Sequence, residues 1–203
     1  MLAASQQVLA ERKALPLSAA SDPARQQAYD WAAGEGRFLD TPAILLDNQT
    51  RASQPGIRVY RVFQPAVESA PLLVELGWLP LPGDRRMPGV ALPSGEVTVS
   101  GLLVAPPSAG IATPVATPQA DGNLLLIGLD HAVLSAALDM PTLAPRVLKL
   151  DPALPLGYTR DLDILPNTLP PERHLGYAVQ WFGLALAVFI TALLLTLRTR
   201  RQR

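Results

Sequence analysis

The longest uninterrupted run of apolar positions lies near the end of the chain. Residues 175–197 read LGYAVQWFGLALAVFITALLLTL and carry no charge, and about 20 such residues suffice to cross a hydrocarbon core of ~30 Å. The basic tail that follows, residues 198–203, contains Arg198, Arg200, Arg201 and Arg203. The pattern predicts a transmembrane helix over 175–197, and the arginines predict a cytoplasmic C-terminus with residues 1–174 on the opposite side.

Upstream of this run, short apolar segments alternate with turn residues. Such segments, bounded by Gly, Pro, Asn and Ser, are typical of strands. They lie at 37–40, 43–47, 57–63, 71–81, 96–105, 123–129 and 146–150. Asp22 before Pro23, and Asp130 at the start of DHAVLSAALDM (130–140), resemble helix N-caps, so two short helices are expected there. The set predicts a β-rich α+β domain, an antiparallel barrel or sandwich with two short helices.

The same pattern divides the chain into segments. We expect an N-terminal segment at 1–20, an outer β-rich domain at 21–165 and a linker at 166–174. The stretch 105–122 should form a long surface loop, and the proline-rich stretch 151–173 should run extended toward the membrane. Because the strands carry their own apolar faces, the outer domain is expected to fold without the helix.

Two details of the strand pattern concern burial. In IRVYRVF (57–63), Arg58 and Tyr60 share a face with Val62, while Arg61 shares the other face with three apolar residues, so neither face is cleanly apolar. Trp78, which follows Gly77 in a strand or at its end, is expected to be a buried anchor.

The predicted orientation requires the outer domain to cross the membrane. The N-terminal sequence MLAASQQVLAERKALPLS contains no signal-peptide core. We therefore expect either a natural start upstream of Met1 or a chain that has been shortened, and we expect the upstream reading frame to encode a further apolar run of ~20 residues.

Composition excludes several classes of function. Seventeen Lys and Arg balance seventeen Asp and Glu, which leaves no basic surplus for a nucleic-acid partner. The absence of cysteine excludes disulfides, thiolate metal sites and thiol nucleophiles. With only His131 and His174, a three-histidine metal site is impossible within one chain, although a mixed site of histidine and carboxylate remains allowed.

No catalytic motif stands out in the sequence. His131 and Ser135 would share one face of the predicted helix, but Asp130 is better explained as its N-cap, and His131 as an ordinary surface residue. The carboxylates of RDLD (160–163) could serve acid–base or metal chemistry, yet they are more typical of a solvated stretch. The sequence therefore predicts a protein that is not an enzyme.

The start of the apolar run contains a histidine and two aromatic residues that could bind a cofactor. His174 is the residue just before the apolar run. Trp181 follows His174 at helical spacing, so the two would lie on one side of a helix. A neutral imidazole at the membrane surface could ligate a haem iron, and an interfacial histidine beside Tyr177 and Trp181 could equally be a residue without a ligand.

A stripe of small residues follows along the same run. Gly183, Ala187 and Thr191 recur every four residues, so they fit close packing against a second helix. The alternative is that small residues are simply common in membrane helices.

Several segments together resemble the Surfeit locus protein 1 family of cytochrome c oxidase assembly factors. PERHLGYAVQWFGLALA (171–187) is similar to the start of the family's second membrane helix, where a His, a Tyr-Ala pair and a Gln-Trp-Phe run recur. LLDNQTRASQPGIRVYRVFQP (45–65), LLVELGWLPLP (72–82) and GEVTVSGLL (95–103) resemble its successive strands. Glu75 and Leu76 depart from the pattern, because the family commonly has Asn-Arg there. QQVLAERKAL (6–15) resembles the stretch that follows the family's first membrane helix.

The resemblance implies a membrane-bound chaperone or haem carrier that promotes insertion of haem a into the catalytic subunit of a haem–copper oxidase. His174 matches the family's candidate haem ligand, with Tyr177 and Trp181 beside the haem. The implied partners are the oxidase catalytic subunit, haem a synthase and the lipid bilayer. The implied location is a bacterial inner membrane with the main domain periplasmic, and a mitochondrial inner membrane is less expected. The rival hypothesis is a scaffold that holds oxidase subunits together and never contacts haem.

Overall fold

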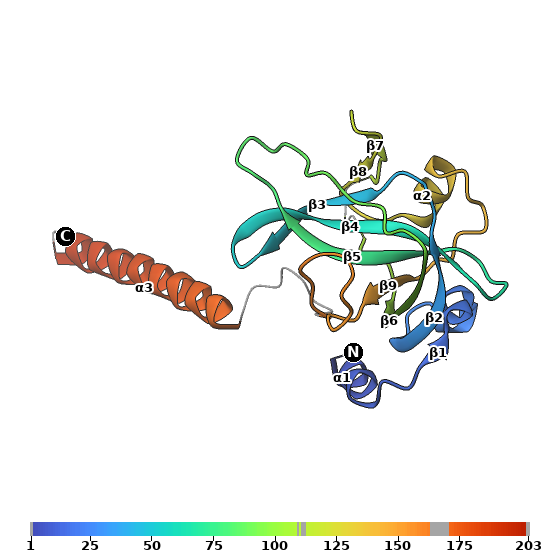
Figure 1. The fold of residues 1–203 in the computed structure, drawn as a ribbon. Coiled ribbons are helices and arrows are strands. Elements are labelled where there is room, and N and C mark those ends of the chain that lie inside the picture. The colour runs from blue at the N-terminus through green and yellow to red at the C-terminus, as the bar shows by residue number, and fades with distance from the viewer. Residues whose placement is uncertain (1, 109, 111–112, 163–170, 202–203) are drawn as a thin grey trace. The chain divides into compact units, whose positions relative to one another are not determined.

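The computed structural model describes residues 2–108, 110, 113–162 and 171–201 of the chain, with the backbone alone at 2, 3, 171–174 and 201. Contacts divide the protein into two compact units, Met1–Pro166 and Asn167–Arg203. The first is β-rich and the second contains one long helix (Figure 1).

The first unit consists mainly of strands. In the described residues these are β1 Leu15–Pro16, β2 Asp30–Phe38, β3 Ile44–Arg51, β4 Gln54–Pro65, β5 Leu72–Pro80, β6 Glu96–Val104, β7 Thr117–Pro118, β8 Leu124–Leu126 and β9 Val147–Leu150. Its helices are α1 Leu2–Glu11, the 3₁₀ turns η1 Leu17–Ser21 and η2 Pro23–Arg25, and α2 His131–Ala137. The β-rich α+β prediction is confirmed.

The described strands form one sheet in the order β1-β2-β6-β9-β5-β4-β3-β8-β7. The sheet curls, because the end of β2 also pairs with β4 through Gly36–Phe38. The resulting architecture is sandwich-like and is not a closed barrel. Three pairings are parallel, β1–β2, β3–β8 and β5–β9, so the sheet is mixed where the strand pattern predicts an antiparallel one. Short strands that return through loops and α2 cause this difference, since a parallel neighbour needs such a crossover.

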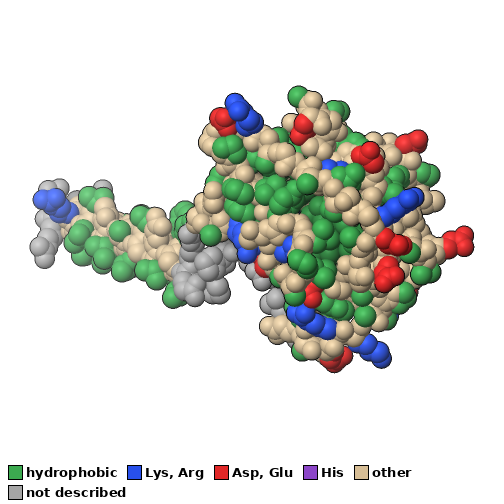
Figure 2. Space-filling view, in the orientation of Figure 1, with side chains coloured by type: hydrophobic (Ala, Val, Ile, Leu, Met, Phe, Trp, Pro, Cys, Tyr) green, Lys and Arg blue, Asp and Glu red, His purple; other side chains and the backbone are tan. Residues whose placement is uncertain are grey.

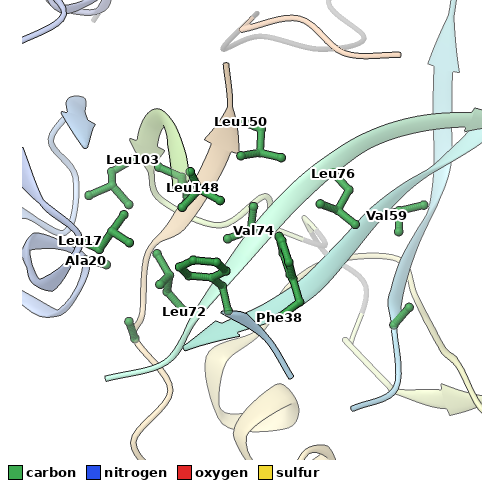
Figure 3. Close-up of a cluster of buried hydrophobic side chains, with 14 of the residues drawn as sticks. Leu17, Ala20, Phe38, Val59, Leu72, Val74, Leu76, Leu103, Leu148 and Leu150 are labelled. Carbon is green, nitrogen blue, oxygen red and sulfur yellow. The ribbon is translucent and has the colours of Figure 1, made fainter. Parts of the chain in front are cut away.

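Alternation along the strands buries two apolar clusters, one on each face of the curled sheet. The first gathers residues from β2, β4, β5, β6 and β9 around Val74 and Leu148, and Figure 3 shows them together with Leu17 and Ala20 of η1. Within it, Phe38 and Phe63 meet edge to face with centroids 5.1 Å apart. The second cluster lies beneath α2, which contributes Leu134 and the C-cap residue Leu138.

Side chains of the N-terminal segment also contact the β-rich unit. Leu17 and Ala20 are buried in the first cluster. The Arg12 guanidinium lies 4.7 Å from the ring centroid of Trp31 and forms an ion pair of 3.0 Å with Asp151. The segment therefore contributes to the same packing as the strands.

Both predicted N-caps are present. The Asp22 side chain accepts a hydrogen bond from the backbone N–H of Ala24 at the start of η2, and Asp130 accepts one from Val133 in α2. Each carboxylate satisfies an N–H that a first turn leaves without an intrahelical partner.

The prediction of an extended linker over 151–173 is wrong for its first part. Residues 151–162 fold back on β5: the N–H of Tyr158 donates to Leu76 O, and the N–H of Trp78 donates to Thr159 O, each at 2.7 Å. Gly77 makes this approach possible, because its φ is +125° and a Cβ there would lie 2.8 Å from Thr159 O. The predicted linker at 166–174 lies largely outside the described residues.

The second unit contains the helix α3, Pro171–Arg201. The most apolar 18-residue window of its stretch Leu175–Arg200 has a mean hydropathy of 2.2, and none of that window is buried inside the protein. By length and composition, it is the one described helix that could cross a membrane.

Candidate functional site

The residues predicted to contact haem lie at the start of α3. Tyr177 and Trp181 are both exposed, with 53% and 71% of their residue surface accessible. His174 belongs to the helical backbone, three residues before Tyr177, but its side chain lies outside the described residues. Figure 2 shows hydrophobic side chains along α3 and basic ones at its C-terminal end. The structure leaves the haem-ligand prediction untested.

The small-residue stripe is also in α3. The Thr191 hydroxyl donates a hydrogen bond of 2.8 Å to the Ala187 carbonyl oxygen, one turn earlier in the helix. This bond satisfies the hydroxyl within its own helix, so the stripe presents little polarity to a neighbour. Its part in helix packing stays a prediction.

His131 and Ser135 do not form a catalytic pair. The His131 ring contacts the Leu143 carbonyl oxygen at 2.6 Å, and the Ser135 hydroxyl donates to Met140 O at 2.5 Å. Both side chains tie α2 to the loop that follows it. A nucleophile needs a base within hydrogen-bond reach, and here each side chain bonds a different backbone carbonyl.

The RDLD carboxylates also differ from the expected solvated stretch. Asp161 forms an ion pair with Arg51 of β3, and Asp163 lies outside the described residues. Arg160 donates to the carbonyl oxygens of Asp151 and Tyr158, at 2.9–3.1 Å. Among the described residues, no group of three or more His, Asp or Glu could hold a metal ion.

Sequence reasoning missed a cavity of about 230 Å³ on the α2 side of the sheet, beside the second apolar cluster. Its floor comes from four strands that are far apart in the chain. It consists of the buried residues Arg58 and Tyr60 of β4, Glu75 of β5, Val104 of β6, and Val147 and Lys149 of β9. Its rim is formed by Gln27, Tyr29, Gln49 and the segment 105–107.

A bulge in β5 brings the polar residues of the cavity floor into contact with one another. Tyr60 lies opposite Glu75, while Val59 lies opposite Gly77, so Leu76 is the extra residue. The Glu75 carboxylate accepts hydrogen bonds from the Arg58 guanidinium and, at 3.1 Å, from the Tyr60 hydroxyl. These bonds compensate for the loss of water around a charge that is only 4% exposed.

Burial and pairing determine the protonation of Tyr60 and Arg58. Desolvation, reinforced by the Glu75 carboxylate, raises the pKa of Tyr60 well above its usual value, so the phenol keeps its proton. Burial, the largest single influence, lowers the pKa of Arg58, but the attractions of Glu75, Tyr60 and Asp161 together outweigh it and raise the pKa of the guanidinium. The floor therefore presents hydrogen-bond donors at neutral pH.

One signal in the sequence pointed to this cavity. Arg58 and Tyr60 occupy the face of β4 that also carries Val62, and a charge on a buried strand face needs a partner. The partner is Glu75, at the position where the Surfeit resemblance breaks down. Its pairing could not be read from the sequence, because the bulge shifts the register of β5.

Comparison with models of known protein families identifies a family. A family model described as the SURF1 family matches residues 1–186. The matched range takes in the β-rich unit and continues into α3 past Trp181. No curated protein matches this chain.

Proposed function

The chain belongs to the SURF1 family, a family of oxidase assembly factors, and from this premise we propose that it promotes insertion of haem a into the catalytic subunit of a haem–copper cytochrome c oxidase. It would act as a membrane-bound chaperone or haem carrier and would catalyse no reaction itself. The observation that carries the proposal is the extent of the family match. The match includes His174, Tyr177 and Trp181, as well as the β-rich unit.

The described residues of α3 support a site at the membrane surface. Tyr177 and Trp181 are one helical turn apart and both exposed, so their rings are accessible to a flat hydrophobic ligand. His174 precedes them by three and seven residues and falls on the same side of the helix. A neutral imidazole can ligate haem iron, and the bound haem a would be the cargo passed to the oxidase.

The same helix supports a location in a membrane. Arg198 and Arg200 follow its apolar stretch, and basic residues favour the cytoplasmic side. We place the protein in a bacterial inner membrane with the β-rich unit in the periplasm. Its partners would be the oxidase catalytic subunit and haem a synthase.

The test is a His174→Ala variant of the full chain, purified in detergent from cells that make haem a. Expression and membrane insertion should be unchanged, because a residue at the membrane boundary contributes little burial. Haem a bound to the purified protein, measured by its absorption spectrum, should fall at least tenfold, and the haem content of the oxidase should fall with it.

His131→Ala is the matched control. It removes the other histidine, whose ring bonds to a backbone carbonyl in the β-rich unit, and it should leave haem unchanged. Equal haem on wild type and His174→Ala would exclude the ligand role.

The second candidate function is a scaffold that holds oxidase subunits together without binding haem. Gly183, Ala187 and Thr191 favour it, because the stripe that they form is suited to close approach of another membrane helix. Leu substitutions at Gly183 and Ala187 should then abolish co-purification with oxidase subunits. If His174→Ala keeps its haem while the Leu variants lose the oxidase, the scaffold function replaces the haem-carrier function.

A further inference from the structure

The cavity between β4, β5, β6 and β9 has a size that limits its occupant. Pockets for drug-sized ligands measure roughly 300–1,000 Å³, whereas this one measures about 230 Å³. Its floor is buried and its rim is half-buried or exposed, so the cavity opens to solvent on one side. A small molecule fits, and a macrocycle such as haem does not.

The charges of the cavity floor compensate one another. The Arg58 guanidinium donates to the Glu75 carboxylate, and the two form an ion pair that is almost entirely buried. Lys149, which also lines the cavity, has an interaction of its own, and the nearby Asp161 pairs with Arg51. An ion that entered would lose its water without gaining a free counter-charge from the described groups. The cavity therefore favours an uncharged ligand.

Both members of the ion pair keep hydrogen-bonding capacity. A guanidinium has five N–H donors, and the Nε of Arg58 has no partner among the described residues. The same holds for Arg61 and Arg146, but neither of them lines this cavity. A carboxylate has about four lone-pair sites, and the hydrogen bonds described for Glu75 come from Arg58 and Tyr60. The floor thus offers donors beside acceptors.

An ionic ligand would complement only one half of this pair. A carboxylate that approached Arg58 would be repelled by Glu75, and a cation that approached Glu75 would be repelled by Arg58. An uncharged primary amide avoids both repulsions, and its carbonyl oxygen accepts while its NH₂ group donates. The apolar lining of Val104, Pro106 and Val147 suits a short hydrocarbon chain attached to such an amide.

We propose that this cavity binds a small primary amide with a short aliphatic chain. The amide oxygen accepts a hydrogen bond from the Arg58 guanidinium, and the amide NH₂ group donates to the Glu75 carboxylate. The chain lies against the apolar lining. The site belongs to the β-rich unit, and the inference does not depend on haem binding by α3.

The first experiment measures binding to the full chain in an uncharged maltoside detergent by isothermal titration calorimetry. Pentanamide, 2-hexanone, pentanoate and pentanamidinium have the same alkyl chain and nearly the same shape, but they differ in charge and in hydrogen bonding. Pentanamide should bind at least tenfold more tightly than either ion. It should bind at least fivefold more tightly than the ketone, which accepts a hydrogen bond but cannot donate one. Because the ketone is the more hydrophobic of the two, partition into detergent would give the opposite order.

Variants then locate the site. Glu75→Gln removes the counter-charge of Arg58 and should reverse the preference, so that pentanoate binds more tightly than pentanamide. Ala105→Trp leaves the ion pair intact but fills the mouth of the cavity from its rim, and it should abolish binding. Glu68→Gln makes the same change as Glu75→Gln at an exposed position between β4 and β5. It is the matched control and should bind as wild type does.

A thermal melt of each variant shows whether it is folded. If Glu75→Gln does not fold, Ala105→Trp decides the matter. The proposal would be overturned if wild type did not bind pentanamide, or bound 2-hexanone or pentanoate equally tightly. Undiminished binding to folded Ala105→Trp, or an unchanged preference for the amide in folded Glu75→Gln, would also overturn it.

Discussion

Trp78 is a buried anchor near the C-terminal end of β5. It is 8% exposed, and its indole N–H donates to Gln49 O at 3.3 Å. A Cβ at Gly56, on the neighbouring strand, would lie 2.4 Å from the indole ring. The ring therefore fills a space that the absence of a side chain at Gly56 creates, and the expectation of a buried anchor is confirmed.

Trp78→Ala should lower the free energy of unfolding by about 3–5 kcal/mol, because it leaves a cavity in a packed region. Urea unfolding of the purified chain, followed by circular dichroism, measures the change. Trp181→Ala is the matched control, since that ring is 71% exposed. A loss below about 1 kcal/mol for Trp78→Ala would contradict the packing role.

The ionisation of Asp30 makes the stability of the fold depend on pH. It accepts hydrogen bonds from Arg25 and, at 2.8 Å, from the fully buried Arg146. The bond from Arg25, aided by Arg146 and opposed by burial, lowers the pKa of Asp30. A carboxyl whose pKa is lower in the folded state stabilises the protein above its unfolded pKa of about 3.9, and that contribution is lost as the pH falls through the folded value.

Asp30→Asn should therefore cost about 3–5 kcal/mol at pH 7, where it leaves Arg146 buried without its counter-charge. The gap between variant and wild type should narrow below about pH 4. Urea unfolding at pH 7, 5 and 3 tests this, with the exposed Asp84→Asn as control. A gap that stays constant with pH would show that the charge of Asp30 is not what stabilises the fold.

Among the elements, the segment 151–162 shows how a stretch without helix or strand is held in place. Arg160 donates to the carbonyl oxygens of Asp151, Leu154, Leu156 and Tyr158. One guanidinium thus satisfies carbonyls that a turn would otherwise expose, and it holds the segment over Gly77.

Arg160→Ala should free this segment without unfolding the sheet. Amide hydrogen exchange should speed up at least tenfold at Tyr158 and Trp78, whose N–H groups bridge the segment and β5. Exchange in the β2–β6 pair should stay as in wild type, because it lies outside these contacts. Unchanged exchange at Trp78 would mean that Arg160 does not hold the segment.

At the scale of the whole molecule, the β-rich unit has its own core and its own hydrogen-bonded sheet. We therefore expect residues 1–166, expressed without α3, to fold with a β-dominated circular dichroism spectrum. A mainly helical spectrum would contradict the fold.

The fragment 21–165 provides the comparison. It lacks Leu17 and Ala20 of the first cluster, and the Arg12 contacts with Trp31 and Asp151. It should therefore melt at a lower temperature than 1–166. Equal melting temperatures would show that residues 1–20 add nothing to the stability of the unit.

The sequence by itself determined the features that depend on neighbouring residues. The apolar run of α3, the caps at Asp22 and Asp130 and most strand positions could be predicted, because hydrophobic length, turn chemistry and period-two alternation are local properties. The family could also be recognised, because its motifs are contiguous stretches that the match to residues 1–186 bears out.

Only the tertiary structure decided the features that join distant segments. Most of β2, with its sequence DWAAGEG, carries little strand signal, and it is a strand because it pairs with β6 along its length. The parallel pairings and the folding back of 151–162 depend on contacts between segments far apart in the chain. The cavity of Arg58, Tyr60 and Glu75 depends in addition on the bulge in β5. Local propensity cannot specify such contacts, because their free energy arises only when the partners meet.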